Sequence, residues 1–233
     1  MNFINLNKAI TTALICGMTF FAATVARAVP VVGSISTVEF GDGNSPDNWI
    51  VDTIDVAGGS IEIGIKAKNR FVGDIVPTAG FVYQAELGNS PTPDPGLARW
   101  NFEWSAIFTD LDPDDFVVML GIDFKPNDPD LANRLFSDVT SVPELVAGVF
   151  QGSQNVGFNF WPVLFPGHPA IMPIDPFAAG IYQFSLELFE VQGPSLSRID
   201  MTVQVQVLPE PGIVVLFSIG LLGLMAFRRR RVS

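Results

Sequence analysis

The amino-acid sequence predicts an all-β fold, an antiparallel β-sandwich or jelly roll, flanked by an N-terminal signal helix and a single C-terminal hydrophobic helix. The first observation is a period-two alternation of apolar and polar residues, which is typical of strands buried on one face. It runs through residues 61–66, 100–109, 182–188 and 201–207. The second is a set of turn signals between these segments, such as Gly58-Gly59. The third is an apolar run near each end of the chain.

Two of the alternating segments are predicted to pair with each other. Residues 181–191 and 197–207 lie on either side of a turn signal at 192–195, so we expect an antiparallel hairpin. The alternation changes phase at Leu188-Phe189. Since an extra residue in one strand produces such a phase change, we expect a β-bulge at this point.

Other segments of the middle region are less regular. The continuous apolar run 116–122 predicts a strand buried on both faces. Residues 129–139 are expected to form a short helix. Residues 161–180 contain five prolines and predict a long irregular loop.

The chain of 233 residues divides into a signal peptide at 1–28, a β-sandwich domain at 29–207 and a sorting and anchoring segment at 208–233. Hydrophobic residues make up 48% and charged residues 16%, a composition that favours a packed core over disorder. The one cysteine, Cys16, lies in the signal segment. The sandwich domain therefore has no disulfide and depends on its core for stability.

The charge is concentrated in the middle of the chain. Residues 1–28 carry +2 and residues 209–233 carry +3, so the net charge of −11 leaves −16 on residues 29–208. A domain with this charge repels phosphate backbones and anionic lipid surfaces. We therefore expect no nucleic-acid partner.

The first 28 residues have the three parts of a secretory signal peptide. Lys8 precedes an apolar run at 9–23, and Ala26 and Ala28 fit the small residues of a signal peptidase site. A transmembrane anchor is the alternative, but the run is shorter than the roughly 20 residues that a span needs. A lipoprotein based on Cys16 is disfavoured because the bulky Ile15 precedes it. We expect cleavage after Ala28.

The C-terminal segment also has three parts. Pro209, Glu210 and Pro211 form an extended stretch, because the two prolines fix φ and lack backbone donors. An apolar stretch follows and predicts a hydrophobic helix at 212–227. Four basic residues then act as a stop-transfer signal that stays in the cytoplasm. They are Arg228, Arg229, Arg230 and Arg231.

This tail, residues 208–231, resembles the PEP-CTERM sorting domain, which combines a Pro-Glu-Pro motif, a short apolar helix with glycines and a terminal arginine cluster. The resemblance implies recognition of Pro209, Glu210 and Pro211 by exosortase, a processing enzyme embedded in the membranes of Gram-negative bacteria. It also implies anchoring in the inner membrane before processing, transfer to the cell surface or extracellular matrix, and an association with exopolysaccharide and biofilms.

Two other interpretations of the tail are considered. One is a simple one-helix membrane anchor. The other is a sortase signal, since residues 208–212 have the layout Leu-Pro-x-Thr-Gly, but Pro211 occupies the place of the threonine that would form the acyl link. The sorting domain explains more of the segment than either alternative.

Four carboxylates in the middle region form the best polar cluster. A hard cation such as Ca²⁺ takes several oxygen ligands, which this cluster offers. The glycine and distal glutamate of an EF-hand loop are missing, and Pro113 interrupts it. A solvated acidic turn is the favoured interpretation, with calcium as the alternative and no other cofactor expected. The residues are Asp110, Asp112, Asp114 and Asp115.

Signs of catalysis are weak. His168 is the only histidine, and no Gly-x-Ser-x-Gly motif is present. Exposed strand carboxylates such as Glu62, Glu86 and Glu103 offer a glycosidase pair only if they converge. Of the four tryptophans, Trp100 and Trp104 are expected in the core, Trp161 is the best candidate for sugar stacking, and Trp49 is unassigned.

We therefore expect a structural or interaction protein of the cell surface or biofilm matrix, and not an enzyme. The alternatives are a secreted carbohydrate-binding module and a secreted hydrolase. Fold alone does not separate these classes, because β-sandwiches serve all three.

Overall fold

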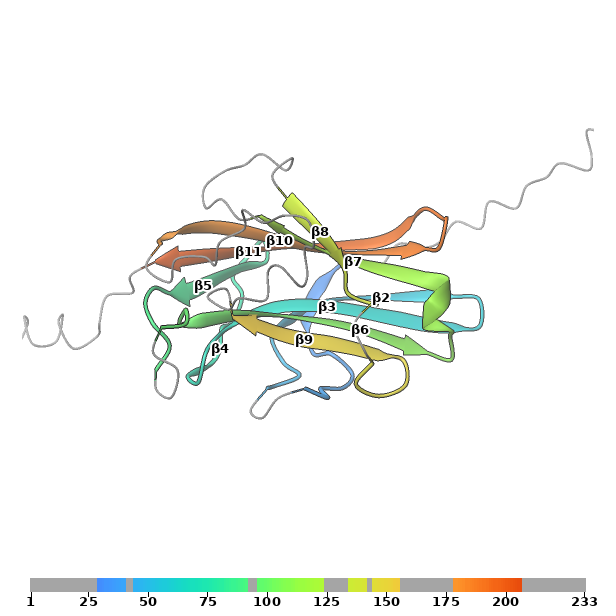
Figure 1. The fold of residues 1–233 in the computed structure, drawn as a ribbon, viewed down its shortest axis with the longest axis horizontal. Helices are drawn as coiled ribbons and strands as arrows, with labels where there is room; N and C mark the ends of the chain where they lie inside the picture. The colour runs from blue at the N-terminus through green and yellow to red at the C-terminus, as the bar shows by residue number, and fades with distance from the viewer. Residues whose placement is uncertain are drawn as a thin grey trace, which may run out of the picture.

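The computed structural model of the protein describes residues 29–40, 44–91, 96–123, 134–141, 144–155 and 178–206. These residues form two β-sheets packed face to face, without an α-helix among them, so the predicted β-sandwich is confirmed (Figure 1). The predicted signal helix and C-terminal helix fall outside the described residues.

One layer, here called sheet A, contains six strands. Its strand order is β1-β2-β3-β6-β9, with the short β4 paired to β3, and all pairs are antiparallel. The strands are β1 (Val31–Gly33), β2 (Trp49–Val56), β3 (Gly59–Asn69), β4 (Gly73–Asp74), β6 (Trp100–Thr109) and β9 (Val149–Asn155).

The second layer, sheet B, has five strands in the order β5-β11-β10-β7-β8. They are β5 (Val82–Glu86), β7 (Phe116–Asp123), β8 (Arg134–Asp138), β10 (Gly180–Glu190) and β11 (Ser195–Gln206). A 3₁₀-helix, η1 (Pro113–Asp115), precedes β7.

Two predictions from the sequence are wrong in sheet B. β5 runs parallel to β11, so the sandwich is not purely antiparallel. More than 100 residues separate the two strands in the chain, which leaves ample length for the crossover that parallel pairing needs. Within 129–139 the structure describes 134–139, and 134–138 form β8 instead of a helix, because they pair with the edge of β7.

The predicted hairpin is confirmed as β10 and β11, joined by a turn at 191–194. Their register shifts between Leu188 and Phe189, where the change of phase predicted a bulge. β11 ends at Gln206, the last described residue. The hairpin therefore leads the chain from the sandwich directly toward its C-terminal segment.

The core lies between the two sheets and is rich in aromatic side chains. Trp100 and Phe102 of β6 face Tyr182 and Phe184 of β10, and the rings of Phe102 and Phe184 lie 4.9 Å apart between centroids. All four side chains are buried. Each contributes roughly 2 to 3 kcal/mol through apolar burial, so these pairs hold the layers together.

The strand predicted at 116–122 is confirmed as β7, but it is not fully buried on both faces. The side chains that face sheet A, such as Val118 and Leu120, are buried. Val117 and Met119 on the opposite face are half-buried. β7 pairs with β10 on one side and with β8 on the other, both within sheet B.

The outer face of sheet A is covered by the preceding part of the chain, residues 34–40 and 44–48, which we call the N-terminal segment (Figure 1). Ile35, Trp49 and Val51 form a small apolar cluster beneath it. Gly64 of β3 makes this approach feasible, because a Cβ there would lie 2.9 Å from a methyl carbon of Ile35 and 3.2 Å from the ring of Trp49.

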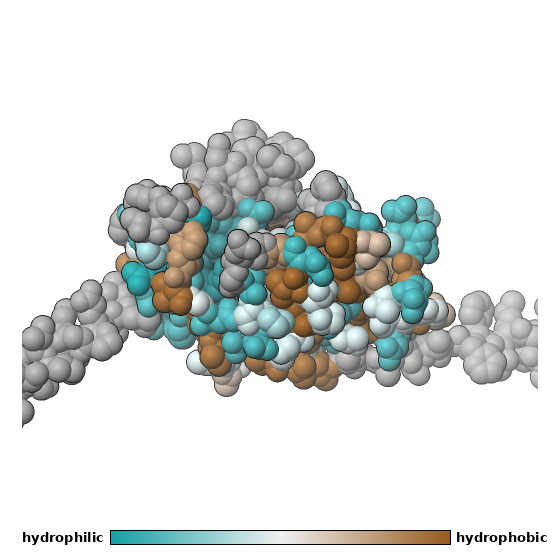
Figure 2. Space-filling model, turned by 90° about the horizontal axis from the view of Figure 1, so that it is seen from below, coloured by the Kyte–Doolittle hydropathy of each residue, from teal (hydrophilic) through white to brown (hydrophobic). Residues whose placement is uncertain are grey.

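Polar side chains fasten the rest of this segment to the sheet. The Glu62 carboxylate of β3 accepts hydrogen bonds from the backbone N–H and the hydroxyl of Ser36, at 2.8 and 3.0 Å. Gln151 of β9 donates to the carbonyl of Thr37 at 2.8 Å and accepts from the N–H of Glu39 at 2.9 Å. The surface seen from this side mixes polar and apolar patches (Figure 2).

Candidate functional site

The sorting residues predicted from the sequence lie outside the described residues. This applies to Pro209, Glu210 and Pro211, to the hydrophobic stretch 212–227 and to the arginines at 228–231. It also applies to Ala26 and Ala28 of the predicted signal peptidase site. Their roles stay predictions from the sequence and from the comparison reported below.

The four aspartates of the acidic cluster occupy the connection between β6 and β7. Asp112 caps η1, since its carboxylate accepts a hydrogen bond from the N–H of Asp114 at 3.1 Å. Asp110 has a positive φ of 58° and is exposed, as are Asp114 and Asp115. In the described part of the chain no group of three or more His, Cys, Asp or Glu is arranged to hold a metal ion. The geometry supports a capped, solvated turn.

Three of the four tryptophans belong to the interior. Trp100 and Trp104 are buried between the sheets as expected, and Trp49 is buried beneath the N-terminal segment. None of the three offers a ring to a sugar. Trp161 and His168 fall outside the described residues, so a carbohydrate-stacking role for Trp161 stays a prediction.

The three strand carboxylates are each engaged by other residues. Glu62 binds Ser36, as described above. Glu86 forms an ion pair with Arg99. Glu103 was expected to be exposed and is instead completely buried, because the N-terminal segment covers the outer face of β6. Each carboxylate therefore has a separate structural partner.

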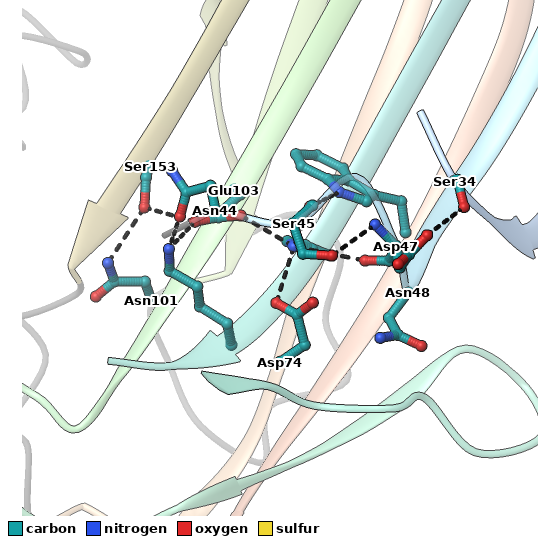
Figure 3. A network of polar contacts seen from close by, with 12 residues as sticks. Ser34, Asn44, Ser45, Asp47, Asn48, Asp74, Asn101, Glu103 and Ser153 are labelled. Carbon is teal, nitrogen blue, oxygen red and sulfur yellow. Dashed lines mark hydrogen bonds and ion pairs between the residues drawn. The ribbon is translucent and has the colours of Figure 1, made fainter. Parts of the chain in front are cut away.

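Glu103 belongs to a buried group of charges that we call the ion cluster, made of Lys66, Lys68, Asp74 and Glu103 (Figure 3). The Lys66 side chain is completely buried. Its ammonium lies 3.0 Å from Oδ1 of Asp74 and 3.5 Å from Oε2 of Glu103. Two cations and two anions balance each other, as burial of charge requires.

The same ammonium connects the ion cluster to the N-terminal segment. Lys66 Nζ donates to the carbonyl oxygen of Ser45 at 2.8 Å and lies over the ring of Trp49, 5.0 Å from its centroid. The indole N–H of Trp49 donates to the same Ser45 carbonyl at 3.1 Å. One backbone oxygen of the segment is therefore held by two side chains of sheet A.

Lys68 occupies the neighbouring position on the same face of β3. Its ammonium lies 2.6 Å from Oε1 of Glu103 and contacts Oδ1 of Asn44 in the N-terminal segment. The hydroxyl of Ser153 on β9 donates to the same Glu103 oxygen at 2.9 Å. Figure 3 shows Asn44, Glu103 and Ser153 lying side by side. The arrangement brings a primary amine, a carboxamide and a carboxylate together.

A second buried carboxylate lies between the two sheets. Asp52 of β2 is 3% exposed and points into the sandwich, where it accepts a hydrogen bond from the hydroxyl of Ser197 on β11. The only histidine of the chain, His168, is outside the described residues. The Asp52–Ser197 contact is a polar link between the two layers.

The sequence alone does not reveal the ion cluster. Lys66, Lys68 and Glu103 all stand at the polar positions of alternating strands, where solvent exposure is the default expectation. The weak signal available is composition: Lys66 directly follows the apolar alternation of Ile61, Ile63 and Ile65, in a chain with only 16% charged residues.

No α-helix with the length and hydropathy of a membrane span occurs among the described residues. A search of curated proteins found no match to this chain. The scan against protein families matched residues 207–231, described as the PEP-CTERM protein-sorting motif. The matched segment begins immediately after β11 and includes Pro209, Glu210, Pro211 and the arginines 228–231. This protein carries a PEP-CTERM protein-sorting motif at its C-terminal end.

Proposed function

We propose that this protein is an exported structural or interaction protein of the cell surface or biofilm matrix, delivered there by exosortase-type processing of its tail. The observation that carries the proposal is the position of the sorting motif. It starts at residue 207, directly after the last strand of the sandwich, which ends at Gln206. A processing enzyme that acts at Pro209, Glu210 and Pro211 would release the folded domain intact.

A binding or structural role suits the described part of the sandwich better than catalysis. The buried carboxylates of Glu103 and Asp52 are engaged by lysines and by a serine, and Glu62 and Glu86 have separate partners. The −16 charge of residues 29–208 disfavours nucleic acid and keeps the domain soluble after release. The proposed partners are signal peptidase, exosortase and, at the surface, exopolysaccharide.

The test is C-terminal peptide mapping by mass spectrometry of the protein isolated from its native host. We expect a mature chain that ends between Pro209 and Gly212, found in the surface or extracellular fraction. Glu210→Gln should reduce this processed form strongly. Glu190→Gln, the same chemical change at an exposed position of β10, is the matched control and should be processed normally.

If peptides from residues 213–227 persist in the membrane fraction of wild-type cells, the tail is a permanent anchor. Normal processing of Glu210→Gln would show that the motif glutamate is not read. Either result contradicts the sorting proposal.

A further inference from the structure

The contact between Asn44, Lys68 and Glu103 has a chemical capacity that protein sorting does not use. Lys68 comes from β3, Glu103 from β6 and Asn44 from the N-terminal segment, so the three meet only in the folded state. The Lys68 amine nitrogen contacts Oδ1 of Asn44 and lies 2.6 Å from Oε1 of Glu103. Figure 3 shows Asn44 and Glu103 next to each other.

We propose that the side chains of Lys68 and Asn44 are joined by an intramolecular isopeptide bond, with Glu103 as the proton-transferring catalytic residue. A lysine amine is a nucleophile once it has lost a proton, and a carboxylate within hydrogen-bond distance can remove that proton. Folding holds the amine against the carboxamide, which gives the reaction the advantage of an intramolecular step.

The reaction balances without an oxidant or any other co-reactant. The Nζ–Cγ bond between Lys68 and Asn44 forms, and the Cγ–Nδ2 bond of Asn44 breaks. Two protons pass from Nζ to the departing nitrogen by way of Glu103, so the ammonium of Lys68 and the amide of Asn44 become a secondary amide and one ammonium ion. The positive charge leaves with that ion, and Glu103 returns to its carboxylate form.

Neighbouring polar groups orient Glu103 and Asn44. Glu103 is completely buried and receives a hydrogen bond from Ser153 at 2.9 Å, which fixes its carboxylate. Nδ2 of Asn44 donates to the carbonyl of Phe40 at 2.7 Å, so Oδ1 is the atom turned toward Lys68. Water is excluded from Glu103, whereas Lys68 is 14% exposed and Asn44 is half-buried.

Lys66 is not the attacking amine, although it also contacts Glu103. Its Nζ is directed to the Ser45 carbonyl and to Asp74, at 2.8 and 3.0 Å. The structure therefore assigns the two lysines different tasks: Lys66 holds the segment through ionic and hydrogen bonds, and Lys68 is placed to link it covalently.

The bond would fix the N-terminal segment to sheet A in a domain that has no cysteine for a disulfide. It does not depend on how the tail is processed. A failure of the sorting proposal and a failure of this one are therefore seen in different peptides of the same protein.

Tryptic mapping of the full-length protein, expressed with its signal and tail, tests the proposal. Trypsin does not cleave after an acylated lysine, so the peptide that ends at Lys66 should appear joined to residues 67–70. The branched species should be lighter than the sum of its two arms by one ammonia, about 17 Da. Fragmentation should place the branch on Asn44 and Lys68.

Three variants should abolish the branched peptide and restore the linear one: Lys68→Arg, which keeps a cation beside Glu103, Asn44→Ala, and Glu103→Gln. Glu103→Asp keeps a carboxylate and should restore part of the branch. Glu62→Gln is the matched control, because Glu62 holds the same segment through Ser36 without a role in the reaction, and its branch should persist. Tryptophan fluorescence establishes which variants are folded.

If the folded wild-type protein gives mainly the linear peptide that ends at Lys66, the proposed bond is refuted. A branch on Lys66 overturns the assignment of the nucleophile. An undiminished branch in Glu103→Gln overturns the role of Glu103.

Discussion

Replacement of Lys66 by methionine measures how strongly the ion cluster holds the N-terminal segment. Methionine keeps most of the apolar stem, so packing against Trp49 is largely retained while the ammonium is lost. The loss removes the contacts to Asp74, Glu103 and the Ser45 carbonyl. Removal of one partner from a buried ion pair costs about 3 to 5 kcal/mol.

The lower end of that range applies here for two reasons. Glu103 keeps the Lys68 nitrogen at 2.6 Å as a hydrogen-bond donor, with or without a bond to Asn44, and the Asp74 side chain is 17% exposed, so water can solvate it. We therefore expect the free energy of unfolding to fall by about 3 kcal/mol. For a domain of this size, that loss corresponds to a decrease in Tm of about 9 °C.

Urea denaturation of the purified full-length protein, followed by tryptophan fluorescence, gives the free energy of unfolding. Arg198→Met is the matched control, because Arg198 is also a cation between two carboxylates, those of Glu187 and Asp200, but is one-third exposed. Exposed ion pairs contribute at most about 1 kcal/mol. If Lys66→Met destabilises the protein no more than Arg198→Met, burial does not strengthen the ion cluster and the reasoning is wrong.

Three further predictions follow from buried contacts, each measured by the same urea denaturation. Asn155→Ala removes hydrogen bonds to the N–H and carbonyl of Ala98, the carbonyl of Trp100 and the side chain of Asn101. It should lower the free energy of unfolding by about 4 kcal/mol. Gln154→Ala, at a half-buried neighbouring position, should lower it by less than about 1 kcal/mol. Equal losses would refute this. Gly152→Ala places a Cβ 2.7 Å from the indole nitrogen of Trp104 and should cost about 1 to 3 kcal/mol, whereas Gly33→Ala has no atom within 4 Å of the new Cβ and should be neutral. A neutral Gly152→Ala would mean that the ring of Trp104 moves freely. Tyr83→Phe loses the hydrogen bond to the carbonyl of Asn48 and should cost about 1 kcal/mol near neutral pH. Burial raises the pKa of the Tyr83 hydroxyl in the folded protein. The stabilisation that results is therefore complete below the pKa of the unfolded chain, near 10. It is lost as the pH rises above that value, by up to about 1.4 kcal/mol per pH unit. The stability difference between the two proteins should therefore shrink and reverse above pH 10, and a constant difference would refute the argument.

The strands of the sandwich could be predicted because their information is local. The β10–β11 hairpin follows from two alternating runs around one turn, and the bulge at Leu188-Phe189 follows from a change of phase within ten residues. Local patterns could not predict the parallel pairing of β5 with β11, because that neighbour relation joins segments over 100 residues apart. They also favoured a helix at 129–139, where strand pairing with β7 prevails over residues 134–138.

The ion cluster shows a different limit of the same reasoning. Alternation states which side chains face the other sheet, and it placed Lys66 and Glu103 correctly on the outer face. It does not state what covers that face. The cover comes from residues 34–40 and 44–48, whose position depends on contacts such as Gly64 with Ile35 that appear only in the folded chain. Burial of these charges therefore could not be inferred from their own strands.

The buried apolar cluster beneath the N-terminal segment is small: Ile35, Trp49 and Val51 form it, and the half-buried Val38 and Phe40 pack against it. The attachment of the segment therefore depends also on polar contacts, which water and local opening can break one at a time. A bond between Asn44 and Lys68 would close a loop of about 25 residues and stabilise the folded state by about 3.5 kcal/mol through loss of chain entropy. This is similar to the expected contribution of Lys66, but salt and pH do not weaken a covalent bond as they weaken ion pairs. A cysteine-free domain that functions outside the cell would thereby gain the kind of protection that disulfides give to other exported proteins.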